Sequence, residues 1–167
     1  MSQKSLVEET PISFKDFKAE ILSDYRLLCI SRACSELGRR EVLTGKAKFG
    51  IFGDGKELPQ LILSKFFKKG DFRSGYYRDQ TILMEQGFLS PQEIFAALYA
   101  HPDIDIEPMS GGRQMGGHFV TESHNSNGAW KTLMDQKNHS SDISPTAGQI
   151  PRLVGLAQAS KVSRALN

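Results

Sequence analysis

The chain has no long apolar run, only two cysteines and no excess of charge of either sign. No stretch is long and apolar enough to span a bilayer, so we expect no membrane partner. Cys29 and Cys34 lie five residues apart on an expected helix and point in different directions, which excludes a disulfide framework. With 21 basic and 19 acidic residues, the net charge of +2 does not favour nucleic acid as a partner. These absences favour a reducing compartment, which we expect to be cytoplasmic.

The first twelve residues lack the features of a targeting sequence. They contain Glu8 and Glu9 and no apolar core, which argues against a secretory signal and a mitochondrial transit peptide. We expect residues 1–12 to form a flexible leader. The remaining residues, 13–167, are enough for one domain with a sizeable core.

Apolar residues recur mainly at helical spacing. Ser13 is a good N-cap for the first helix, and Gly38 is expected to stop it. Ser90 and Glu93 have the spacing of a capping box. We expect helices over 13–37, 58–69, 81–87, 91–100 and 148–166 and a strand over 72–77, whereas 103–144 shows neither period.

The stretch Gly70–Gln80, GDFRSGYYRDQ, places Tyr77 and Arg78 at the end of the expected strand. Strand ends are where α/β folds place ligand-binding groups, and arginine can form a fork of hydrogen bonds to phosphate. This pattern predicts a phosphate-binding pair made by Tyr77 and Arg78. The alternative is structural, a buried edge strand capped by an ordinary Arg–Asp pair.

Two further stretches hold candidate site residues. In GGRQMGGH glycine pairs stand on both sides of the Arg-Gln-Met run and precede His118, so the backbone there can approach a ligand, and the imidazole of His118 is a candidate acid or base. The alternative is a surface histidine in a flexible loop. Ser144 and Thr146 precede the last helix, where free N–H groups suit an anion, although simple capping is the alternative. The four histidines show no metal-ligand spacing, so we predict no metal site.

The motifs SGYYRDQ, GGRQMGGH and SPTAGQIP occur in this order, and together they resemble one family. They are similar to the α part of thiamine-diphosphate-dependent 2-oxo acid dehydrogenases, the decarboxylating components of the pyruvate and branched-chain complexes. The Gly-Arg-Gln-Met run at 112–115 favours the branched-chain type. The resemblance covers about residues 45–164.

The resemblance implies a mostly α-helical fragment of an α/β thiamine-diphosphate-binding fold, with at most one or two short strands. It implies that Tyr77 and Arg78 contact the diphosphate and that Ser144 and Thr146 lie near the cofactor's rings. His118 would face the active-site channel. The implied partners are a β subunit or fused β half, a lipoyl-bearing acyltransferase that accepts the acyl group, and a 2-oxo acid substrate.

The family's Mg²⁺ ligands come from a Gly-Asp-Gly-type turn followed by an asparagine, beyond the helix that ends near Asn167. Gly53–Asp54–Gly55 precedes the Tyr–Arg stretch and does not correspond to that turn. We therefore expect the Mg²⁺ ligands to lie outside this chain. We also expect the chain to be inactive alone, and to bury uncovered apolar faces by self-association.

A different class of function is a helical anion-binding or scaffold module without catalysis. From Lys65 to Arg78 five basic residues stand against one acid, Asp71. Such a patch can bind phosphorylated ligands, although a charge run is more often a solvated face. Binding of polyanions that depends steeply on salt would distinguish this class.

Overall fold

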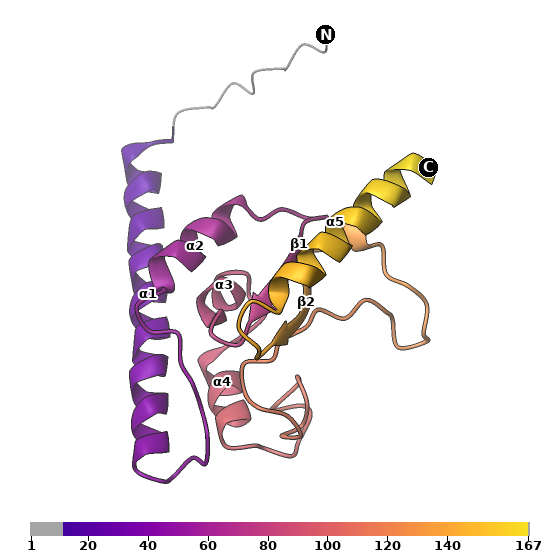
Figure 1. Cartoon of the computed structure of the whole chain (residues 1–167). Helices are drawn as coiled ribbons and strands as arrows, with labels where there is room; N and C mark the ends of the chain where they lie inside the picture. Colours follow the sequence, from indigo (N-terminus) through magenta and orange to yellow (C-terminus); the bar gives the residue numbers. More distant parts are fainter. Residues whose placement is uncertain (1–11, 167) are drawn as a thin grey trace.

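The computed structural model describes residues 12–166, so most of the predicted leader and Asn167 lie outside the described residues. The described part is mostly helical and contains one two-stranded parallel sheet, as predicted (Figure 1). The elements, in order, are α1 (Phe14–Leu43), α2 (Glu57–Phe66), β1 (Phe72–Tyr76), α3 (Gln80–Glu85), α4 (Pro91–Leu98), a 3₁₀ turn (Leu133–Asp135), β2 (Asn138–Ile143) and α5 (Gln149–Leu166).

Helix α1 begins as predicted but ends later. The Ser13 hydroxyl accepts a hydrogen bond from the Asp16 N–H at 3.1 Å, which caps the helix. The predicted stop at Gly38 is wrong, because α1 continues to Leu43. Gly38 is buried under the ring of Phe52, and a side chain there would overlap that ring. This glycine therefore serves close packing rather than helix termination.

Helix α4 follows the predicted capping box. The Ser90 hydroxyl accepts from the Glu93 N–H, and the Glu93 carboxylate accepts from the Ser90 N–H at 2.7 Å. The helix ends at Leu98, two residues before the predicted end.

The core lies around α3, between the long helix α1 and the sheet (Figure 1). Ile82 and Leu83 of α3 are 1% exposed and pack with Leu89, Ile94 and Phe119. Helix α5 differs from the others, because none of its described residues is buried and it projects away from the rest of the chain (Figure 1). Within residues 12–166 no helix combines the length and apolar character needed to cross a membrane.

Strand β2 was not expected from the sequence. Residues 103–144 show no period, yet Asn138–Ile143 pairs in parallel with β1, with Arg73 opposite His139 and Ser74 opposite Ser140. The buried positions of β2 are polar, namely Asn138, His139 and Asp142. A search for alternating apolar residues therefore misses this strand.

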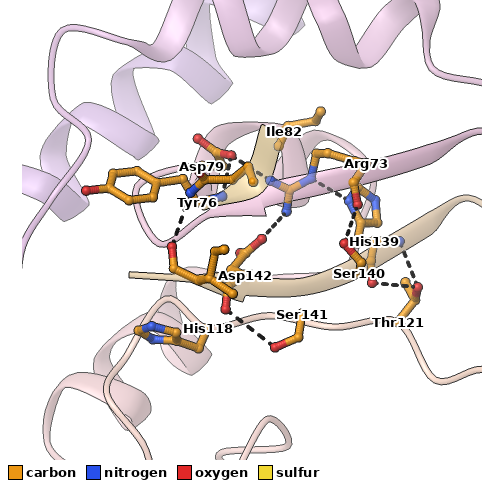
Figure 2. A network of polar contacts seen from close by, with 12 residues as sticks. Arg73, Tyr76, Asp79, Ile82, His118, Thr121, His139, Ser140, Ser141 and Asp142 are labelled. Atoms are coloured by element: carbon orange, nitrogen blue, oxygen red, sulfur yellow. Dashed lines mark hydrogen bonds and ion pairs between the residues drawn. The ribbon is translucent and has the colours of Figure 1, made fainter. Parts of the chain in front are cut away.

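A buried arginine joins the two strands (Figure 2). Arg73 of β1 is 7% exposed, and its Nε donates to Nδ1 of His139 at 2.8 Å. Its two terminal nitrogens bind the carboxylates of Asp79 at 2.6 Å and Asp142 at 2.9 Å. We call these four residues the Arg73 cluster.

An irregularity in the strand pairing makes the Arg73 cluster possible. Side chains alternate along a strand, so His139 and Asp142, three residues apart, would normally face opposite sides. The register shifts between Ser74 and Tyr76, where two steps on β1 match three on β2. The shift allows both side chains to reach Arg73. Gly75 lies beneath the ion pair, and a side chain there would overlap both Arg73 and Asp142.

We predict that Gly75→Ala lowers the free energy of unfolding by about 3 kcal/mol, because the added methyl group displaces one partner of a buried ion pair. Gly155→Ala is the matched control, since Gly155 lies exposed in α5 with open space around it. This control should be neutral or stabilising by up to about 1 kcal/mol. Urea unfolding of both variants measures the difference in their free energies of unfolding. Equal changes in the two variants would show that a side chain at position 75 does not disturb the ion pair.

Candidate functional site

The carboxyl ends of β1 and β2 bring the predicted site residues to one place. Tyr77 and Arg78 follow β1, and Ser144 and Thr146 follow β2 and precede α5. Parallel strands end at the same edge of a sheet, and this edge is where open α/β sheets bind ligands. The two motifs are therefore neighbours in space although they are more than sixty residues apart in the sequence.

Three hydroxyl groups meet at this edge. Tyr76 donates a hydrogen bond of 2.8 Å to the Tyr77 hydroxyl, and its oxygen lies 3.5 Å from the Thr146 hydroxyl. The centres of the two tyrosine rings are 4.1 Å apart. Because hydroxyl groups can all donate, this arrangement suits an acceptor-rich ligand.

Arg78 adds a positive charge to the three hydroxyls. Its guanidinium carbon lies 5.1 Å from the centre of the Tyr76 ring and 5.7 Å from that of Tyr77. Its Nε is buried and has no hydrogen-bond partner in the described structure. An Arg–Asp pair of the kind that the structural alternative predicts is present, but it joins Asp79 to Arg73 and does not include Arg78.

His118 lies on the other side of Tyr77. The two rings are stacked with centres 6.1 Å apart, and His118 Nε2 lies 2.6 Å from the Ser144 hydroxyl. His118 Nδ1 lies 2.9 Å from the Met115 carbonyl, which can only accept. The proton is therefore on Nδ1, and Nε2 accepts from Ser144. Thus the structure brings together all five residues predicted from the three motifs.

The glycine-rich loop reaches Tyr77 because Gly117 has no side chain. Gly117 has φ 85°, and a side chain there would overlap the Tyr77 carbonyl. The start of this loop is fixed by Glu107, which is 1% exposed and which the sequence did not single out. Its carboxylate accepts from the N–H groups of Met109, Ser110 and Gly112. Burial alone would raise the pKa of Glu107, but these hydrogen bonds bring it below its ordinary value.

An apolar cavity of about 180 Å³ adjoins the site. Tyr77 and Ser144 line it together with Phe52, Leu98 and Met115. Arg78, His118 and Thr146 are not among its lining residues. The charged and hydroxyl groups therefore lie beside an apolar cavity rather than within it.

Two other features bear on the predicted chemistry. Among residues 12–166 no group of three histidine, cysteine, aspartate or glutamate side chains could hold a metal ion. Within the basic run from Lys65 to Arg78, Lys65 pairs with Glu20 and Asp24 and Arg73 is buried in its cluster, whereas Lys68 and Lys69 are exposed.

Comparison with known proteins gives a distant relation. No protein-family model matches the chain. The 2-oxoisovalerate dehydrogenase subunit alpha of Bacillus subtilis (strain 168) is similar, with 26% identity over 147 residues. The match covers 87% of this chain but 39% of that protein, so the chain spans well under half the length of this relative. At this level of identity the similarity indicates a distant relation to the family of that subunit.

The Arg73 cluster gives a pH-dependent contribution to stability. Burial is the main cause that raises the pKa of Asp142 from 3.8 to about 7. The folded state therefore binds this proton more tightly than the unfolded state does, which stabilises the folded state at low pH. This contribution to the free energy of unfolding is lost as pH rises from about 4 through about 7. Burial, followed by the charge of Arg73, lowers the pKa of His139 from 6.5 to about 3. Between pH 3 and 6.5 His139 therefore makes the free energy of unfolding rise with pH, which is opposite to the effect of Asp142. Above that range His139 adds no pH dependence.

We predict that the free energy of unfolding of Asp142→Asn increases relative to that of the unmodified chain as pH rises from 4 to about 7. The difference should change by at most about 1.4 kcal/mol per pH unit. The difference should level off above about pH 8, where Asp142 is ionised in both states. Urea unfolding of both proteins at pH 5, 6, 7 and 8 measures it, and the contribution of His139 cancels in the comparison. A difference that does not change with pH would mean that Asp142 is already ionised in the folded protein.

Proposed function

We propose that this chain is the amino-terminal part of the α component of a thiamine-diphosphate-dependent 2-oxo acid dehydrogenase. The observation that carries this proposal is made at the shared carboxyl edge of β1 and β2. There Tyr77 and Arg78 lie against each other and beside Tyr76, whose hydroxyl oxygen is 3.5 Å from that of Thr146. The distant relation to a 2-oxoisovalerate dehydrogenase alpha subunit supports the class of reaction. Residues 13–167 would then be a portion of the cofactor-binding domain.

The residues present fit the diphosphate part of the cofactor. A diphosphate offers only acceptor oxygens and negative charge, and the site offers hydroxyl donors and one guanidinium group. The unpartnered Nε of Arg78 is a buried donor that an anion would satisfy. The nearest carboxylate in sequence, Asp79, is neutralised by Arg73 and does not compete.

Mg²⁺ normally accompanies a bound diphosphate and needs an octahedral set of oxygen ligands. The described residues offer no acidic cluster for it. We propose that its protein ligands lie outside this chain, as the resemblance implies.

Thiamine diphosphate, when bound, supplies the carbanion-stabilising chemistry that decarboxylation of a 2-oxo acid requires. The residues of this chain bind and orient. Arg78 and Tyr77 would hold the diphosphate, whereas Ser144 and Thr146 would lie near the rings of the cofactor. His118 would face the substrate or the lipoyl group, with Nε2 as the atom able to take a proton because Nδ1 already carries one.

Half of such a site must come from elsewhere. We propose that a β subunit or a fused β half completes it, and that a lipoyl-bearing acyltransferase accepts the acyl group. The Gly-Arg-Gln-Met run at 112–115 favours the branched-chain type of this family. The chain alone is then inactive.

We predict that the isolated chain self-associates through apolar surfaces that the proposed partner half would cover. Helix α5 exposes Ile150, Leu153 and Val154, and no described residue of it is buried. Sedimentation velocity should show a mass that rises with concentration, and Val154→Glu should reduce it. Lys161→Glu, a charge change at an exposed position of the same helix, is the control. A concentration-independent monomer would contradict this prediction.

We predict that Arg78→Ala weakens thiamine diphosphate binding about 100-fold, because a charge-assisted fork of hydrogen bonds is lost. Titration calorimetry with Mg²⁺ would compare this chain with a longer form that reaches the metal-binding motif, assembled with its β partner. The short chain should bind weakly and the assembly tightly, and Arg26→Ala on the exposed face of α1 should change neither.

Two results would count against the proposal. The first is an assembly that binds thiamine diphosphate equally well without Arg78. The second is an assembly that does not bind it at all, while the chain binds polyanions with steep salt dependence, which would favour the scaffold alternative.

A further inference from the structure

The sequence singled out Tyr77 and Arg78, but the structure places Tyr76 between them and the start of α5. Tyr76 is the last residue of β1. Its hydroxyl donates to Tyr77 at 2.8 Å and lies 3.5 Å from the hydroxyl of Thr146. The Arg78 guanidinium lies closer to its ring than to that of Tyr77, at 5.1 Å against 5.7 Å.

The side chain of Tyr76 is not part of the buried core. Its backbone N–H donates to Asp79 at 2.9 Å and thus touches the Arg73 cluster. Its ring points away from Arg73, toward the end of the sheet near which His118 lies (Figure 2). The backbone therefore fixes the position of Tyr76, while the phenol group is free to meet a ligand.

The surroundings of the Tyr76 oxygen favour negative charge. Once ionised, the Tyr76 oxygen can accept hydrogen bonds from Thr146 and then Tyr77, and these bonds together with the positive charge of Arg78 lower the pKa of Tyr76 below its ordinary value. The same donors would stabilise an anionic oxygen of a ligand placed among them. This electrostatic effect agrees with the contact geometry.

We propose that Tyr76 is a third diphosphate-binding residue, whose hydroxyl donates to the same anion as Tyr77 and Arg78. The proposal rests on the proposed function and extends it to a residue outside the Tyr-Arg pair. On ligand binding the Tyr76 hydroxyl exchanges its hydrogen bond to Tyr77 for one to a phosphate oxygen. Such charge-assisted bonds are stronger than those between neutral groups.

The test uses Tyr76→Phe in the full chain, with inorganic pyrophosphate as the probe. Phenylalanine keeps the ring against Arg78 and the backbone bond to Asp79, so only the hydroxyl is lost. Titration followed by ³¹P NMR detects weak binding, and circular dichroism melts confirm that each variant is folded. Tyr25→Phe is the matched control, because Tyr25 is an exposed phenol on α1.

We expect Arg78-dependent binding of pyrophosphate that Tyr76→Phe weakens about tenfold, the effect of one hydrogen bond to a charged group. Tyr77→Phe should weaken it similarly, and Tyr25→Phe should leave it unchanged. The proposal is overturned if Tyr76→Phe behaves as Tyr25→Phe does, or if the unmodified chain shows no Arg78-dependent binding. In either case the thiamine diphosphate titration of the assembly still decides the proposed function separately, since it depends on Arg78 and not on Tyr76.

Discussion

The fork of hydrogen bonds made by the buried Arg73 is the interaction on which the site depends. One guanidinium group binds His139, Asp79 and Asp142, and so joins β1, the turn after it and β2. The backbone pairing and the Ser140 hydroxyl, which donates to the Arg73 carbonyl at 2.9 Å, help to set the register of the two strands. The register in turn decides that Tyr77 and Arg78 lie beside Ser144 and Thr146. Burying these charges is costly, so the cluster serves specific geometry more than net stability.

The electrostatics of the cluster follow from one cation facing two carboxylates. Asp79 is partly exposed and remains the natural counter-ion, whereas the side chain of Asp142 is 1% exposed, and burial raises its pKa to about 7. His139 accepts from Arg73 and donates to Gln86 through Nε2 at 2.7 Å, so it is held neutral. Arg73 is thereby fully engaged, which leaves Arg78 as the cation at the sheet's edge that is available to a ligand.

The site and the apolar surfaces support the same interpretation. The donors lie at one edge of a small sheet, beside an apolar cavity, and α5 extends from this edge with its apolar residues exposed. Such a layout is expected of a surface that a partner completes.

The sequence by itself determined the local features. Capping chemistry defined the start of α1 and the N-cap of α4, and apolar periodicity indicated the other helices. The three motifs singled out the candidate site residues Tyr77, Arg78, His118, Ser144 and Thr146. Only the tertiary structure decided which contacts these residues make. Strand β2 is polar where it is buried, so its pairing depends on Arg73 rather than on a hydrophobic pattern. Gly38 looked like a helix stop because local propensity cannot reveal that Phe52 packs on it. Likewise Arg73 and Arg78 have the same chemistry, and only packing makes one a structural clamp and the other a candidate ligand-binding group.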